Sequence, residues 1–164
     1  MTDVTRWLDD EQQAAWRAWI AASLLLPDRL SRDLQDRAGI SLADYEILVH
    51  LSESPGRRLR MSELADLTLS SRSRLSHQVD RLDDAGLVSR EPCSEDRRGS
   101  FAVLTPAGWD FLVATAPAHV ESVREHLVDV LTPEEFATFG RLCAKVAERL
   151  RPTEPDKGSC HGDH

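Results

Sequence analysis

The chain has 164 residues, which suits one domain, or two closely joined pieces, with a sizeable buried core. Its net charge of −8 excludes a uniformly basic surface of the kind that binds nucleic acid without selectivity. However, nine arginines fall between residues 57 and 98, whereas acidic residues crowd towards the two ends of the chain. Because a ligand experiences the local field, this distribution still allows a nucleic-acid site in the middle of the chain.

Hydropathy and cysteine content narrow the class of protein further. No apolar run approaches the ~18 to 20 residues that span a bilayer, and no basic segment followed by an apolar stretch opens the chain. Cys93, Cys143 and Cys160 are too few and too scattered for a disulfide framework. We therefore expect a cytoplasmic protein with no membrane partner.

Two helices are predicted before the arginine-rich segment. After an irregular start over residues 1–10, apolar residues recur at helical spacing as far as Leu34, and Gly39 ends that helix. Pro27 lies in its middle and is expected to kink or break it. A second helix over residues 42–53, capped by Ser41, stops before the turn at residues 54–56.

Two shorter helices follow. Ser62 is expected to cap the first, and residues 68–70 break it. The second begins at Ser70 or Ser71 and ends at Ala85-Gly86. Its buried stripe consists of Leu75, Val79 and Leu82. Its outward face carries Ser73, Arg74, Ser76, His77 and Arg81.

A hairpin comes directly after this pair of helices. Residues 87–91 and 101–104 are β-prone, and the stretch between them is polar, with residues 96–99 (Asp-Arg-Arg-Gly) at its tip. The order helix, turn, helix, hairpin predicts a mainly α fold built on a winged helix-turn-helix, with the hairpin as a small wing.

The last part of the chain predicts two more helices. Thr105-Pro106 begins one that runs to about Val130 and bends at Pro117, and Thr132-Pro133-Glu134-Glu135 begins the other with a capping box. The last helix carries an apolar seam of Phe136, Phe139, Cys143, Val146 and Leu150. No further segment is left to cover this seam, so a second copy of the chain is expected to do so.

The spacing of three motifs connects the chain to a known family. They are residues 82–91 (Leu-Asp-Asp-Ala-Gly-Leu-Val-Ser-Arg-Glu), Asp96-Arg97-Arg98, and residues 104–108 (Leu-Thr-Pro-Ala-Gly). In this combination the chain resembles the MarR family of bacterial transcription regulators, most clearly over residues 40–112. The resemblance implies a homodimer, usually a repressor, that binds an inverted-repeat operator, and an additional short strand at residues 57–60.

The predicted organisation follows from the helices and the resemblance together. Residues 1–38 form an N-terminal dimerisation helix and residues 39–104 the winged helix-turn-helix. Residues 105–151 form the C-terminal dimerisation helices, and residues 152–164 a flexible tail.

The predicted DNA contacts come from the recognition helix and the wing. Arginine pairs bidentately with guanine, and hydroxyl groups and helix N-termini hold phosphates. The helix is expected to contribute Ser71, Arg72, Ser73, Arg74, Ser76, His77 and Arg81. In the wing, Asp96 and Arg98 match a family pattern in which the aspartate steadies an arginine in the minor groove, and Arg97 reaches a phosphate. Asp80 would repel DNA, so we expect it to turn aside or to pair with Arg81.

An effector site is the second candidate. Family members bind small aromatic, often anionic, effectors where the first, second and fifth helices meet, and the residues placed there are Trp16, Trp19, Tyr45 and His50. The alternative interpretation is that these side chains only pack in the core.

Other chemistry is weighed against simpler interpretations. The run Cys160-His161-Gly162-Asp163-His164 contains metal-ligand types, but a tail without supporting contacts is favoured, so no metal site is assigned. His119 and His126 are expected to pack, and Cys93 to be an incidental thiol rather than a redox sensor. No catalytic motif is present, so we predict neither an enzyme nor a cofactor. The remaining alternatives are a winged-helix protein that acts through protein contacts and a metal- or redox-responsive regulator.

Overall fold

The computed structural model of the chain describes residues 5–93 and 99–151. Its described part is mainly helical and carries one small antiparallel sheet, so the predicted fold class is confirmed. The elements in chain order are α1 (Asp10–Ala38), α2 (Leu42–Glu53), η1 (Pro55–Arg57), β1 (Arg58–Arg60), α3 (Met61–Leu67), α4 (Arg72–Asp84), β2 (Val88–Pro92), β3 (Ser100–Leu104), α5 (Pro106–Val123), the π-helical turn η2 (Arg124–Val128) and α6 (Pro133–Leu150).

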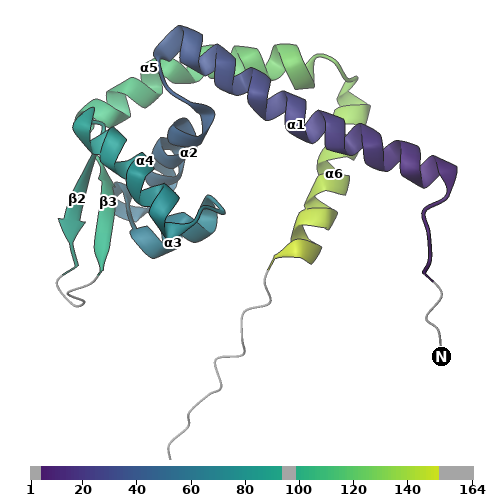
Figure 1. Cartoon of the computed structure of the whole chain (residues 1–164). Helices are drawn as coiled ribbons and strands as arrows, with labels where there is room; N and C mark the ends of the chain where they lie inside the picture. Colours follow the sequence, from purple (N-terminus) through teal and green to yellow (C-terminus); the bar gives the residue numbers. More distant parts are fainter. Residues whose placement is uncertain (1–4, 94–98, 152–164) are drawn as a thin grey trace, which may run out of the picture.

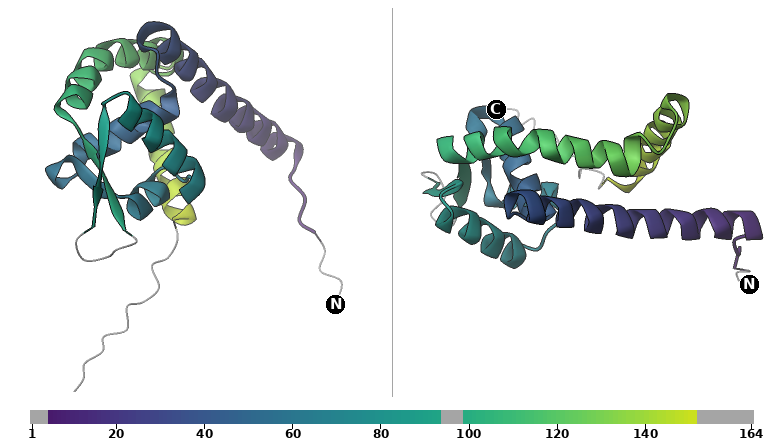
Figure 2. Two further views of the ribbon diagram at one scale, coloured as in Figure 1. Left: turned by 60° about the vertical axis from the view of Figure 1, so that its left-hand side comes forward. Right: turned by 90° about the horizontal axis from the view of Figure 1, so that it is seen from above.

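The winged region, made of α2, α3, α4 and the sheet, lies at one end of the molecule (Figure 1). From it α1 and α5 extend side by side, and α6 turns away from the far end of α5 (Figure 2). The largest fully buried side chains include Ile47, Leu48, Leu51, Leu64 and Leu75, so the core sits inside the winged region. By contrast, α6 has no buried residue.

Helix α1 is continuous from Asp10 to Ala38 with Pro27 inside it, so the expectation that Pro27 could break the helix is wrong. Proline removes one backbone hydrogen bond from a helix interior. The rest of the helix is held by a capping box between Asp9 and Gln12 and by Gly39, whose φ of 70° suits a left-handed cap. Packing of its second half against α5 adds to this.

The sheet has the strand order β1-β3-β2, which confirms the short additional strand before the helix pair. Strand β3 is central: its residue Ala102 pairs with Leu59 of β1 on one side and with Arg90 of β2 on the other. Pro92, which the sequence places in the polar stretch between the two strands, is the last residue of β2 and pairs with Ser100. An edge strand tolerates proline because its outer N–H has no partner strand to bond.

Two predicted boundaries need correction. Helix α3 begins at Met61, because the backbone N–H of Arg60 donates to Glu63 at 3.1 Å, so Ser62 is not its cap. Helix α5, which we expect to bend at Pro117 and to reach about Val130, continues as an α-helix through Pro117 and passes at Arg124 into η2. The caps at Ser41, Ser71, Thr105 and Thr132 are confirmed.

None of the helices within residues 5–93 and 99–151 is long and apolar enough to cross a membrane. The predicted tail at residues 152–164, including its Cys and His residues, lies outside the described residues.

Candidate nucleic-acid interface

The first turns of α4 form the exposed polar surface that the sequence predicts. Ser71 caps the helix by accepting a hydrogen bond from the backbone N–H of Arg74 at 3.2 Å. Arg72, Ser73, Arg74 and His77 are all exposed, while the apolar stripe on the other side of the helix is buried in the core. The helix N-terminus adds partial positive charge at the same place. This surface can therefore accept phosphates and read base edges.

Arg81 is held by α2. Its Nη2 donates to both carboxylate oxygens of Asp44, at 2.9 and 3.1 Å, and the carboxylate is largely buried. Arg81 therefore fixes α4 to the first turn of α2, a role that the sequence did not reveal because the partners are 37 residues apart. The expected pair between Asp80 and Arg81 is wrong.

Asp80 pairs instead with Arg90 of β2, at 2.7 Å. The same Nη2 of Arg90 also donates to the side-chain and backbone oxygens of Ser76, at 2.9 and 3.0 Å. Ser76 is half-buried, so its hydroxyl is turned towards the hairpin more than towards solvent. Arg90 was absent from the predicted site, and no local pattern marked it.

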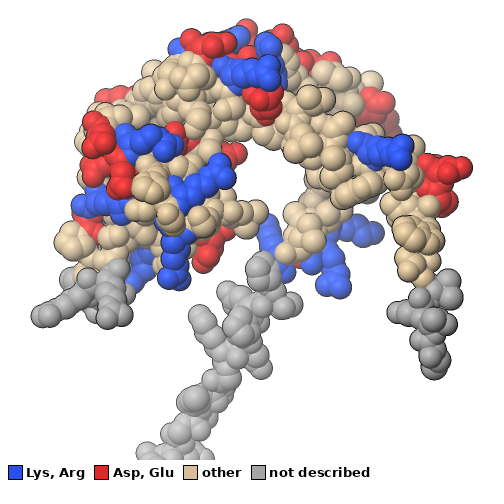
Figure 3. All heavy atoms as spheres, viewed as in Figure 1, with Lys and Arg blue, Asp and Glu red and all other residues tan. Residues whose placement is uncertain are grey.

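The wing itself is described only at its base. Cys93 is buried, and its N–H donates to the carbonyl oxygen of Gly99 at 2.9 Å, which closes the hairpin. Asp96, Arg97 and Arg98 lie outside the described residues. Figure 3 shows basic side chains projecting from the lower side of the winged region, the side towards which the hairpin points.

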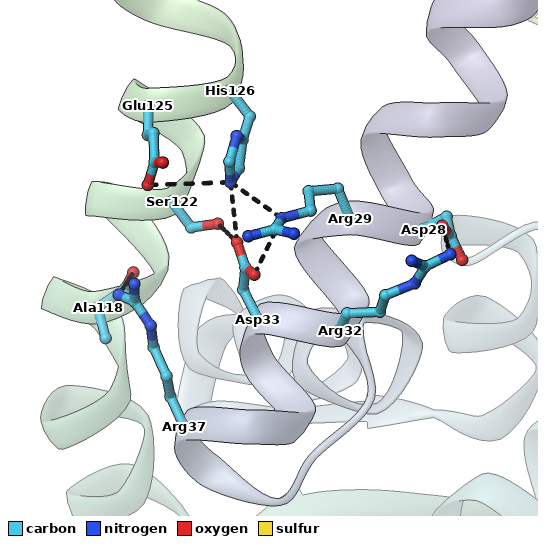
Figure 4. A network of polar contacts seen from close by, with 9 residues as sticks. All are labelled: Asp28, Arg29, Arg32, Asp33, Arg37, Ala118, Ser122, Glu125 and His126. Carbon is cyan, nitrogen blue, oxygen red and sulfur yellow. Dashed lines mark hydrogen bonds and ion pairs between the residues drawn. The ribbon is translucent and has the colours of Figure 1, made fainter.

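A buried polar cluster joins α1 to α5 and η2 (Figure 4). The carboxylate of Asp33 accepts a hydrogen bond from Ser122 Oγ at 2.5 Å, bonds to His126 Nε2 at 3.0 Å and forms an ion pair with Arg29 Nε at 3.1 Å. Burial would raise the pKa of Asp33, but the hydrogen bond from Ser122 lowers it most, and His126 and the charge of Arg29 lower it further. The pKa of Asp33 is therefore below its ordinary value. The cluster fixes the helix pair that extends from the winged region.

Comparison with known proteins now places this geometry. A sequence model of the MarR family matches residues 38–99. The chain is 49% identical to Sco3205, a MarR family transcriptional regulator from Streptomyces coelicolor whose crystal structure is in complex with DNA, with a TM-score of 0.85 over 93% of this chain and 96% of that one. The chain belongs to the MarR family.

Two further relatives agree with that assignment. AbsC, a MarR family transcriptional regulator from Streptomyces coelicolor, is 50% identical with a TM-score of 0.82, over 90% of this chain and 99% of that one. The HTH-type transcriptional regulator PecS of Dickeya dadantii is 28% identical over 130 residues, covering 77% of this chain and 76% of its relative. The family consists of transcription regulators, so the protein is not classed as an enzyme.

The predicted effector residues of this MarR-family protein do not all come together. Tyr45 and His50 line an open pocket of about 420 Å³ between α1, α2 and α5, together with His119 and apolar side chains. Trp16 and Trp19 do not line it, because they lie on the N-terminal half of α1 and are 52% and 46% exposed. Their grouping with Tyr45 and His50 is wrong, since helical spacing does not show how far along α1 the winged region reaches.

The chemistry of the pocket favours an occupant without negative charge. The ring of His119 packs against Tyr45 with centroids 4.7 Å apart, and burial lowers the pKa of His119 while it raises that of Tyr45. Glu46 contributes a carboxylate to the lining, and the described residues of the lining include no lysine or arginine. An aromatic anion would therefore meet no fixed positive charge there.

No group of three or more metal-ligating side chains occurs in the part of the chain that the structure describes. His126 bonds to Asp33 and His119 packs on Tyr45, so both histidines make structural contacts.

Proposed function

We propose that this protein is a homodimeric, sequence-specific regulator that binds double-stranded DNA with α4 in the major groove and the hairpin at the adjacent minor groove. The observation that carries the proposal is the exposed, Ser71-capped first turn of α4 in front of a wing. The 49% identity of the chain to a MarR regulator crystallised with DNA supports the proposal. Because the proposed partner is the bacterial chromosome, we also propose that the protein is cytoplasmic.

The structure's contacts refine which predicted residues would face DNA. Arg72, Ser73, Arg74 and His77 are exposed and are assigned to bases and phosphates, with Ser71 at the phosphate-binding helix start. Asp96, Arg97 and Arg98 remain predicted wing contacts. Ser76 and Arg81 are engaged within the protein, so we assign them to holding α4 in place.

Dimerisation is supported by apolar side chains that the single chain leaves uncovered. They are Trp16, Trp19 and Ile20 on α1 and Leu142, Val146 and Leu150 on α6. Exposed apolar patches of this kind mark protein interfaces. We propose that α1 and α5–α6, within residues 1–38 and 105–151, form a two-fold interface. It would place two winged regions in successive major grooves about one helical turn apart.

We further propose that the bound dimer represses transcription and that a small molecule in the pocket between α1, α2 and α5 releases it. A dimer covering two turns of a promoter excludes polymerase by steric overlap. The pocket lies where α2 of the winged region meets α1 and α5, the two helices that extend from it. An occupant that favours another arrangement of these helices would weaken DNA binding.

The experiment begins with selection of a duplex from a random library by the purified protein. Arg74→Ala should then lose about 1 to 3 kcal/mol of binding free energy on the selected duplex and much less on random DNA, because a base contact carries sequence information. Arg32→Gln is the control, since Arg32 pairs with Asp28 on α1 and removal of its charge leaves α4 intact. Failure of the protein to enrich any sequence would contradict the proposed function.

The effector proposal is tested on the same duplex with a panel of neutral aromatic compounds, aromatic amines and aromatic acids. The pocket chemistry predicts release by neutral or cationic members and little effect of an acid such as salicylate. Release should be lost in a Tyr45→Leu variant that still binds DNA. Release by acids alone would contradict this assignment.

A further inference from the structure

We propose that Arg90 is a positioning residue that sets the wing and the recognition helix in a single rigid arrangement for reading DNA. The inference rests on the proposed DNA-binding function and adds to it a determinant that itself does not touch DNA.

The contacts of Arg90 join the two DNA-binding elements. Arg90 lies on β2, where it pairs with Ala102 of β3, so it belongs to the hairpin that carries the wing. Its Nη2 bonds Ser76 Oγ at 2.9 Å, the Ser76 carbonyl at 3.0 Å and Asp80 Oδ1 at 2.7 Å. Ser76 and Asp80 are one turn apart on α4, so one guanidinium nitrogen spans a full turn of the recognition helix.

The guanidinium is also withdrawn from solvent. The Arg90 side chain is 28% exposed, compared with 60% for Arg81, and its Nε is buried without a hydrogen-bond partner among the described residues. The three hydrogen bonds of Nη2 hold the side chain in place, and they must also offset the free-energy cost of the buried Nε. Its charge therefore points into the joint between α4 and β2.

The contact with Arg90 also changes the charge that the recognition helix presents to DNA. Asp80 is an exposed carboxylate on an element that would approach phosphates, and the ion pair with Arg90 offsets its repulsion. The next residue along α4, Arg81, forms an ion pair with Asp44 of α2. Helix α4 is thus held from the hairpin and from α2 by two neighbouring residues. The exposed turn at residues 72–77 and the wing then meet DNA at a fixed separation.

Positioning and direct phosphate contact predict different measurements. Loss of a phosphate contact weakens binding to all duplexes and reduces the salt slope by about one unit. Loss of a positioning contact weakens the selected duplex, where both elements must engage together, and leaves the slope and random-DNA binding almost unchanged. Asp80 separates the two cases further, because neutralising it would strengthen binding if its only effect on DNA were repulsion.

The experiment measures affinity for the duplex selected by the wild-type protein, and for random duplex, at several salt concentrations. We expect Arg90→Gln to bind the selected duplex about tenfold more weakly, roughly the loss of one base contact, with random-DNA binding changed less than about threefold and the slope retained. Asp80→Asn should weaken the selected duplex in the same direction, and the double variant should lose no more than Arg90→Gln alone. Arg90→Lys keeps the charge without the planar fork, so it should restore only part of the selectivity.

Arg32→Gln serves as the charge-matched control and should keep wild-type selectivity, and thermal unfolding of each variant shows which remain folded. If Arg90→Gln is unfolded, Asp80→Asn decides the question. Equal losses on both duplexes with a reduced slope, tighter binding of the selected duplex by Asp80→Asn, or wild-type selectivity in Arg90→Gln would each overturn the inference. Failure of the wild-type protein to select any duplex would instead overturn the proposed function, and the inference with it.

Discussion

Removal of the Ser122 hydroxyl should destabilise the fold through Asp33. Ser122 is 1% exposed, and its Oγ donates to the buried carboxylate of Asp33 at 2.5 Å. A hydrogen bond to a charged group contributes about 1.5 to 3 kcal/mol, and Ser122→Ala leaves the carboxylate with its contact to His126 and its ion pair with Arg29. At roughly 2 to 4 °C per kcal/mol for a chain of this size, the midpoint of thermal unfolding should fall by about 3 to 12 °C.

The loss should depend on pH in one direction. The pKa of Asp33 is lowered in the folded protein, chiefly by the Ser122 hydrogen bond, so the ionised form stabilises the fold. That contribution is present above the unfolded pKa of about 3.9 and is lost as pH falls through the folded pKa. The difference between wild type and Ser122→Ala is therefore full above about pH 5 and shrinks at more acid pH.

Urea unfolding followed by circular dichroism measures both effects, at one fixed protein concentration because unfolding of the proposed dimer would depend on concentration. Ser52→Ala is the matched control, since its hydroxyl bonds only to the carbonyl of Val49 in the same helix, and it should stay within about 0.5 kcal/mol of wild type. A loss for Ser122→Ala no larger than that of the control, or a loss of equal size at pH 7 and pH 2, would refute the reasoning.

Three further outcomes are expected. Gly108→Ala should destabilise the fold by at least about 1 to 3 kcal/mol in urea unfolding, because a Cβ there would lie 2.0 Å from the carbonyl oxygen of Leu87; near-wild-type stability would contradict that packing. Val146→Asp should give a monomer in sedimentation at micromolar concentration, since this 56% exposed side chain lies on the uncovered face of α6, and an intact dimer would place the interface elsewhere. Arg98→Ala should weaken binding to selected and random duplexes alike and reduce the salt slope by about one unit, whereas unchanged binding would remove the wing from the interface.

Local features of the sequence were enough to predict the order of elements. Ser41, Ser71, Thr105 and Thr132 cap their helices as expected, because a cap depends on atoms within three or four residues of it. The close approach of the Leu87 backbone explains why a glycine occupies position 108 of the family motif. The fold class followed for the same reason, since the helices and the hairpin are each marked by short-range patterns.

The partners of the polar side chains were decided by the tertiary structure. Asp33 and Ser122 are 89 residues apart, and Asp44 and Arg81 are 37 apart, so no helical or strand spacing connects them. Two predicted DNA contacts, Ser76 and Arg81, proved to be bonded within the protein for this reason. The direction of an exposed face follows from periodicity along one helix, whereas the bonds of its side chains depend on which other elements the fold brings against it.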